Sequence, residues 1–132
     1  MSARFDKVKE YVLELGLRID EEIPAEEMLI AADPERGVHN LIIDCEDELL
    51  VLEQLILKLD PRAPADVHRR LLQMNRGLVC GAFVLDEQGE GLLFRDTLAL
   101  TNLDLNELES SINALSLGLA EYGRELLAYA RQ

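Results

Sequence analysis

The chain has 132 residues and a mass of 14.9 kDa, the size of one domain with a single hydrophobic core. Its 26 acidic and 13 basic residues give a net charge of −13. Nucleic acids and anionic membrane surfaces are bound mainly through Lys and Arg, so this charge argues against both as partners. It favours a partner with basic segments, or serves solubility alone. With 48% hydrophobic residues, the chain is too apolar to be disordered.

The two cysteines, Cys45 and Cys80, each lie within an apolar run. We therefore predict buried free thiols, as is usual in a reducing compartment, and not a disulfide framework. The sequence shows no charged and apolar leader and no uninterrupted apolar stretch of about 18 residues. On these grounds we expect a cytoplasmic protein.

A first helix is predicted over residues 2–15, with Ser2 as its N-cap and Gly16 as its end. Apolar spacings of three and four place on one face of this helix Phe5, Val8, Val12 and Leu15. Residues 17–23 then alternate between apolar and charged side chains. This pattern predicts a brief extended segment.

Three strands are predicted before the middle helix. Residues 28–32 and 38–45 form an apolar hairpin around the turn Asp33–Gly37. Residues 49–59 are interpreted as the third strand. Their leucines also fit a helical stripe, so a helix is the alternative at this position.

The second half of the chain predicts a helix over 65–74, a hairpin of strands 78–85 and 91–100, and a long helix over 105–130. Asn75 is expected to end the middle helix in a left-handed conformation, and Asp104 with Glu107 resembles a capping box. The last helix has heptad spacing without charged flanks, so it is interpreted as crossing a sheet with part of its flank open to a partner. The order helix, three strands, helix, two strands, helix predicts an α+β fold, with an antiparallel sheet packed by helices in a single domain, residues 1–132.

The sequence contains no pattern that indicates catalysis. His39 and His68 are isolated, and zinc sites need closely spaced ligand pairs. His39 and Cys45 lie six residues apart on one strand, so both could face the same side. The acidic run 44–48 lacks the alternating ligands and central glycine of a calcium loop, and no nucleophile elbow or phosphate-binding loop occurs. We predict no catalytic residues, no metal site and no cofactor.

Four short stretches resemble a known family: Leu71–Asn75 (LLQMN), Gly81–Asp86 (GAFVLD), Gly91–Phe94 (GLLF) and Asp104–Leu108 (DLNEL). In order and spacing they resemble YbjN-type proteins and the class I type III secretion chaperones of the Tir-chaperone type. Those proteins have the same element order and are also small and acidic. The resemblance covers essentially the whole chain.

The resemblance implies a non-enzymatic homodimer that binds an extended segment of a partner polypeptide over apolar patches and sheet edges. It implies a dimer interface built by the middle helix and the following strand, at Leu71, Leu72, Met74, Val79, Phe83 and Leu85. It places contacts with a partner or effector segment on the first helix and the first strands, at Phe5, Val8, Val12, Ile30, Leu41 and Ile43.

Two other functions are compatible with the same scaffold. One is a small signalling or stress regulator that binds a folded partner or a small ligand, and the other is a hydrolase. A peptide-binding protein should expose an apolar patch larger than a few hundred Å². A ligand-binding regulator should have a closed pocket of roughly 300–1,000 Å³, and an enzyme should add a titratable group buried in it.

Overall fold

The computed structural model of the protein describes residues 2–131. In chain order its elements are α1 (Ala3–Glu14), β1 (Arg18–Ile23), the 3-10 turn η1 (Pro24–Glu26), β2 (Met28–Asp33), the 3-10 turn η2 (Pro34–Arg36), β3 (Val38–Glu46), β4 (Leu49–Lys58), α2 (Val67–Arg76), β5 (Ala82–Leu85), β6 (Gly91–Ala99) and α3 (Leu105–Leu127). The strands form one antiparallel sheet in the order β1-β2-β3-β4-β6-β5. The predicted α+β class is confirmed.

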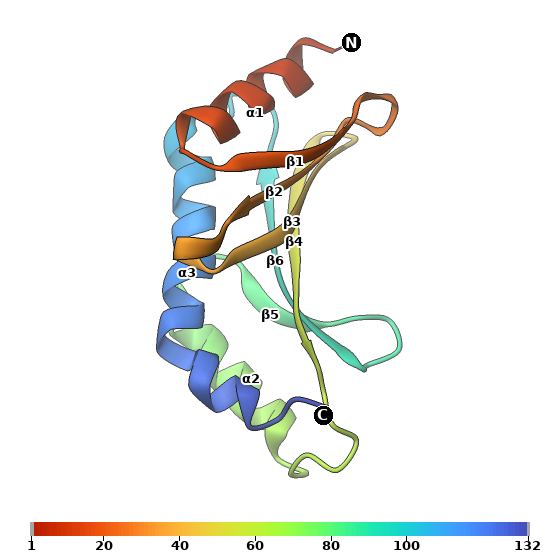
Figure 1. The fold of residues 1–132 in the computed structure, drawn as a ribbon, viewed down its shortest axis with the longest axis vertical. Helices are drawn as coiled ribbons and strands as arrows, with labels where there is room; N and C mark the ends of the chain where they lie inside the picture. The colour runs from red at the N-terminus through yellow and green to blue at the C-terminus, as the bar shows by residue number, and fades with distance from the viewer. Residues whose placement is uncertain (1, 132) are drawn as a thin grey trace.

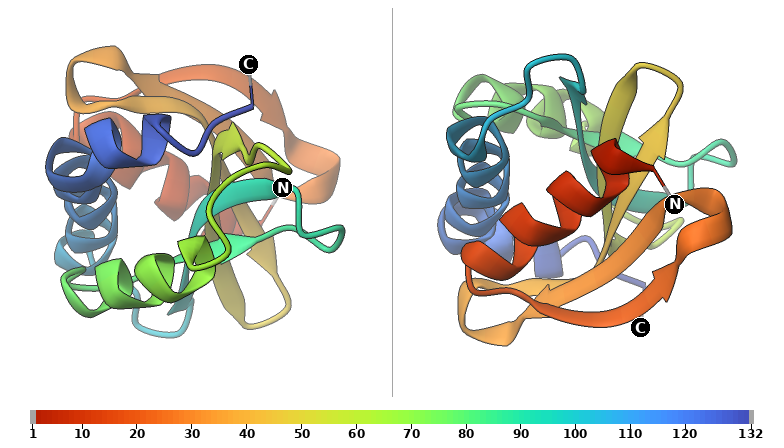
Figure 2. Two further views of the ribbon diagram at one scale, coloured as in Figure 1. Left: turned by 90° about the horizontal axis from the view of Figure 1, so that it is seen from below. Right: turned by 90° about the horizontal axis from the view of Figure 1, so that it is seen from above.

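The three helices lie on one side of the bent sheet, and the other face carries no helix (Figures 1 and 2). Strand β4 shows the two faces by its alternation. Leu50 and Leu52 point inward and are at most 1% exposed, whereas Leu49 and Leu55 lie on the outer face and are 45% and 53% exposed. The outer face is therefore partly apolar and open to solvent.

The buried side chains form two clusters. The main core joins α1, strands β2 to β4 and the first half of α3, and includes Phe5, Leu41 and Ile112. The second core joins α2 to β5, the start of β6 and the end of α3, and consists of Leu59, Val67, Leu71, Met74, Phe83, Leu92 and Leu126. The helix that the sequence resemblance associates with dimerisation thus has a small core of its own.

The predicted starts of the first and last helices are confirmed by their caps, whereas the middle helix, predicted from residue 65, begins at Val67 without a side-chain cap. Ser2 Oγ accepts a hydrogen bond of 3.2 Å from the amide of Phe5 at the start of α1. At the start of α3, Asp104 accepts from the Glu107 amide at 2.8 Å, and Glu107 accepts from the Asp104 amide at 3.2 Å. These reciprocal bonds satisfy backbone donors that a helix cannot pair internally.

The brief extended segment at 17–23 is a full strand, β1, so four strands precede α2 where the sequence predicted three. Strand β1 pairs with β2 from Arg18, opposite Ala32, to Ile23, opposite Met28. The sequence pattern predicted only a brief segment because β1 is an edge strand with charged side chains at its outward positions. Few of its side chains are apolar, so the pattern gives little sign of a buried face.

The segment 49–59 is a strand, β4, which removes the helical alternative. It pairs with β3 on one side and β6 on the other, and a pairing shift between Leu55 and Leu57 explains why its apolar spacing also fitted a helix. The prediction for Asn75 was wrong. Helix α2 continues to Arg76, and Asn75 lies inside it without a positive φ.

The strand predicted to begin at residue 78 begins at Ala82. The chain first turns through Gly81, whose φ is +70°. A Cβ at Gly81 would lie 2.4 Å from Cζ of Phe94, so only glycine allows this approach to β6.

Candidate functional site

An apolar groove runs between α2 and the edge strand β5, with a volume of about 390 Å³; we call it the α2–β5 groove. It is lined by His68, Leu71, Leu72, Phe83, Val84, Leu85 and Leu92. Leu71 and Phe83 are buried and contribute to the second core. Leu72 and Leu85 are 71% and 37% exposed. Four of the six residues predicted for a dimer interface therefore line one groove.

The other two residues of that prediction lie elsewhere. Met74 is fully buried in the second core, on the face of α2 that packs against the protein. Val79 lies in the bend after α2 and is 82% exposed, but it borders a different groove.

The outer face of the sheet extends the apolar surface of the α2–β5 groove. Leu55 of β4 lies opposite Leu93 of β6, and Leu93 lies opposite Val84 of β5. Since cross-strand neighbours on one face touch, these side chains form an outer row across three strands. Val84 also lines the α2–β5 groove, so the outer row and the groove meet at this residue.

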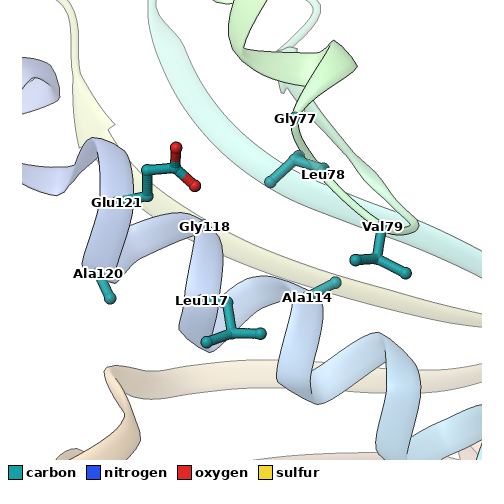
Figure 3. Close-up of a pocket in the computed structure, with 8 residues that line it drawn as sticks. All are labelled: Gly77, Leu78, Val79, Ala114, Leu117, Gly118, Ala120 and Glu121. Carbon is teal, nitrogen blue, oxygen red and sulfur yellow. The ribbon is translucent and has the colours of Figure 1, made fainter.

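A second groove, of about 480 Å³, lies between α3 and the bend that follows α2 (Figure 3). Val79 and Leu117 border it and are 82% and 63% exposed, and its remaining apolar lining comes from Leu78 and from small residues such as Ala114 and Gly118. A Cβ at Gly118 would lie 2.7 Å from Cδ2 of Leu78, so a larger residue here would displace the Leu78 side chain. The predicted open flank of the last helix corresponds to this part of α3.

The residues predicted to contact a partner segment are mostly inside the main core. Five of them are at most 2% exposed: Phe5, Val8, Val12, Leu41 and Ile43. Only Ile30 is half-buried on the outer face, opposite Ile42, which is 37% exposed. The buried five support the surface from beneath and offer no side chain to a partner in this conformation.

Strand β1 carries three carboxylates, of Asp20, Glu21 and Glu22, and one cation, Arg18, so it has an excess of acid. Lys9 of α1 pairs with Glu22 at 2.7 Å, and Arg18 pairs with Asp20 at 2.5 Å. Within residues 2–131, the backbone of β1 forms no hydrogen bond outside its ladder with β2 except through the turn at Pro24. This edge therefore presents unpaired backbone groups beside carboxylates, a combination suited to an extended basic segment.

A second acidic feature lies on the outer face, where Asp44 sits between Met28 and Val51. Burial, reinforced by the neighbouring charge of Glu46, raises the pKa of Asp44 to about 6. A carboxyl group with a pKa of about 6 is mostly ionised at pH 7 and becomes mostly neutral only as the pH falls below 6.

The two thiols show no sign of activation. Burial is the main cause that raises the pKa of Cys45 to about 11, and burial also raises the pKa of Cys80. His39 is exposed while Cys45 is buried, because the left-handed Asn40 interrupts the alternation between them. Within residues 2–131, no three His, Cys, Asp or Glu side chains are placed to hold a metal ion.

The sequence reasoning missed the outer row Leu55, Leu93 and Val84, and it missed Ile42. A signal was present, because β4 is apolar at nearly every position (LLVLEQLIL), where a strand with one solvated face would alternate.

None of the helices within residues 2–131 combines the length and the hydrophobicity that crossing a membrane requires.

The chain is similar to one protein family and to two solved structures. A family model named CesT_Tir_1, the type III secretion chaperone family, matches residues 1–132. The crystal structure of YbjN from E. coli, described as a candidate transcription regulator, is similar with a TM-score of 0.69 and 16% identity over 92% of each chain. The HopA1–SchA chaperone–effector complex is similar with a TM-score of 0.50 and 18% identity, over 92% of this chain and 91% of that chain. No curated protein matches the sequence.

Proposed function

Because the chain belongs to the CesT_Tir_1 family, we propose that it is a non-enzymatic, dimeric, chaperone-like protein that binds an extended segment of a partner polypeptide. The observation that carries this proposal is the apolar surface formed by the α2–β5 groove and the outer row, on a chain of net charge −13. A globule that used all its apolar side chains internally would not leave Leu72 and Leu55 exposed together.

The α2–β5 groove is the part of this surface that we assign to the dimer. Leu72 and Leu85 project as apolar rims above the floor of Leu71 and Phe83. The same patch on a second copy can insert its rims into this groove, as a two-fold interface requires. Val79 extends the proposed contact along the chain, and Met74 supports it from the core.

The partner segment is assigned to the acidic edge of β1 and the adjacent outer face at Ile30 and Ile42. Strand addition supplies backbone hydrogen bonds, and the carboxylates of β1 select lysine- or arginine-bearing segments. The buried residues Phe5, Val8, Leu41 and Ile43 hold α1 and the strands in place beneath this edge.

The shape of the grooves favours a polypeptide over a small ligand. Both apolar grooves are open to solvent, whereas a small-molecule site encloses most of its ligand. Their linings contain few polar groups to orient a compact substrate, which also speaks for a non-enzymatic role.

Sedimentation equilibrium at micromolar concentration tests the dimer. For the wild type we expect twice the chain mass of 14.9 kDa. For Leu72→Gln we expect the mass to fall towards that of the single chain. Leu127→Gln is the matched control, because Leu127 is also a helical leucine with 71% exposure but borders neither groove. A wild-type mass near 14.9 kDa, or equal effects of the two variants, would reject the assignment.

Partner binding is tested with a blocked heptapeptide of alternating lysine and valine, compared with a glutamate–valine heptapeptide. In amide-resolved spectra of the full chain, we expect the lysine peptide to shift the signals of β1 and Ile30. The effect should weaken with added salt because the attraction is screened. Equal shifts with both peptides would contradict the role of the β1 carboxylates.

A further inference from the structure

The sheet has two outer edges, β1 and β5, and β5 is closed by a side chain. Phe83 of β5 lies opposite Phe94 of β6. The Phe83 amide donates a 2.6 Å hydrogen bond to Oδ1 of Asn75, so its backbone points away from β6, as in a non-hydrogen-bonded antiparallel pair. Nδ2 of Asn75 donates back to the Phe83 carbonyl at 3.1 Å. One carboxamide thus makes the two hydrogen bonds that a neighbouring strand would make.

The position of Asn75 is fixed by the packing of α2. Met74 beside it is fully buried in the second core. One turn earlier, Arg70 forms two hydrogen bonds with Glu125 of α3, of 2.7 and 2.9 Å. The helix is therefore anchored on both sides, and the carboxamide is presented to β5 in a fixed orientation.

A second carboxamide hydrogen-bonds to unpaired strand backbone at the start of β3. Strands β3 and β4 are paired only as far as Ile42 and Glu53, and the start of β3 diverges from β4 beyond that pair. Gln54, which is 3% exposed, accepts a hydrogen bond from the His39 amide at 3.0 Å and donates to the Gly37 carbonyl at 3.1 Å. The carboxamide of Gln54 thus pairs with the His39 amide of β3 and with the Gly37 carbonyl just before β3, where β4 does not reach.

The end of β4 is covered by the chain itself. Leu59 pairs with Ala130, and the Arg131 amide donates to the Lys58 carbonyl at 2.7 Å. Strand β1 differs from these places, since within residues 2–131 no side chain hydrogen-bonds its backbone. The edge of β1 carries charged side chains, and its backbone is not closed by a side-chain hydrogen bond in residues 2–131.

We propose that Asn75 is a specificity-determining residue whose carboxamide closes β5 to strand addition, so that a partner strand adds at β1. Strand addition at β1 rests on the proposed function, whereas the closure of β5 by Asn75 does not. It implies that copies of the chain meeting at the α2–β5 groove do so through side chains and do not form a continuous sheet across β5.

The closure is tested in the free protein by amide hydrogen exchange. The Phe83 amide should be protected in the wild type, although it lies on an edge strand. In Asn75→Leu it should exchange at least about tenfold faster, which corresponds to about 1.4 kcal/mol of lost local protection. Asn113→Leu is the control, because Asn113 is an exposed asparagine inside α3. Fast exchange of Phe83 in the wild type, or unchanged protection in Asn75→Leu, would overturn the closure.

A second variant keeps the test valid if Asn75→Leu does not fold. Asn75→Asp retains the acceptor for the Phe83 amide and loses the donor to its carbonyl. We expect Phe83 to stay protected in Asn75→Asp while the carbonyl signal of Phe83 shifts towards that of a carbonyl without a donor. An unchanged carbonyl signal would contradict the assigned role of Nδ2.

The choice of edge is tested with the blocked lysine–valine heptapeptide. The wild type should gain protection at β1 amides and none at β5, whereas Asn75→Leu should also gain protection at Phe83 and Leu85. Protection gained by β5 amides in the wild type would overturn the inference. Closure in the free protein without any gain at β1 would leave the role of Asn75 in closing β5 intact and reject strand binding, so the two failures are distinct.

Discussion

Arg70 of α2 holds Glu125 of α3 through a bidentate pair, with Nε 2.7 Å from Oε2 and Nη2 2.9 Å from Oε1. Tyr129 adds a hydroxyl hydrogen bond of 2.9 Å to the same carboxylate, and the Arg70 guanidinium lies 5.8 Å from the centre of the Tyr122 ring. This network fixes the helix that carries Leu72 and Asn75, and so connects the α2–β5 groove to the end of the chain.

The Arg70 pair predicts an acid-sensitive attachment of α2. The hydrogen bond from Arg70 holds the pKa of Glu125 below its ordinary value of 4.5. A depressed carboxyl pKa adds stability above the unfolded-state value, and that stability is lost as pH falls through the folded-state pKa. We expect denaturant midpoints of the wild type to fall more steeply below pH 4.5 than those of Glu125→Gln. Parallel pH profiles for the two proteins would contradict this role.

Asp44 predicts a change of the opposite sign. Because its folded-state pKa of about 6 exceeds its ordinary value of 3.8, its contribution is favourable below 3.8 and is lost as pH rises through about 6. Asp44→Asn should therefore stabilise the protein at pH 8 by about 1 kcal/mol, after allowance for solvent screening.

The gain from Asp44→Asn should shrink at pH 5, where the wild-type carboxyl is largely protonated. Urea unfolding at the two pH values measures it. Glu46, Glu26 and Glu27 are the charged groups that face Asp44, and Glu46→Gln should lower the pKa of Asp44. A pH-independent difference between Asp44→Asn and the wild type would refute the assignment.

Gly81 and Gly89 form a matched pair of left-handed glycines, with φ of +70° and +74°. Alanine at Gly89 meets open space and should cost only backbone strain, about 1 kcal/mol. Alanine at Gly81 would also clash with the ring of Phe94, so Gly81→Ala should cost at least about 2 kcal/mol. Thermal or urea unfolding compares them, and equal losses would show that the approach of residue 81 to Phe94 is not constrained.

The cysteines are predicted to react slowly with iodoacetamide at pH 8. Burial raises the pKa of both thiols, which keeps them in the unreactive protonated form. Cys80 is partly exposed and donates to the Ser110 carbonyl at 3.4 Å, whereas Cys45 is 6% exposed, so Cys80 should be alkylated first. Mass spectrometry of peptides over time shows the order, and rapid labelling of Cys45 would contradict its burial.

The amino-acid sequence by itself determined the local elements. Apolar spacing in α1, turn residues such as Gly37 and Gly89, and the capping box of Asp104 and Glu107 act within a few residues, so their outcome can be deduced from the chain alone. The α+β class followed from these elements because hairpin connections require antiparallel neighbours.

Only the tertiary structure decided which apolar residues remain exposed on the surface. Leu71 and Leu72 are adjacent leucines of one helix, yet one is 6% and the other 71% exposed, because the position of α2 against β5 sets which side is covered. Asn75 shows the same limit, since its pattern suggested a helix end and its role depends on Phe83, eight residues away along the chain. Contacts between distant elements select among side chains that the sequence leaves equivalent, and this selection creates the surface on which the proposed function rests.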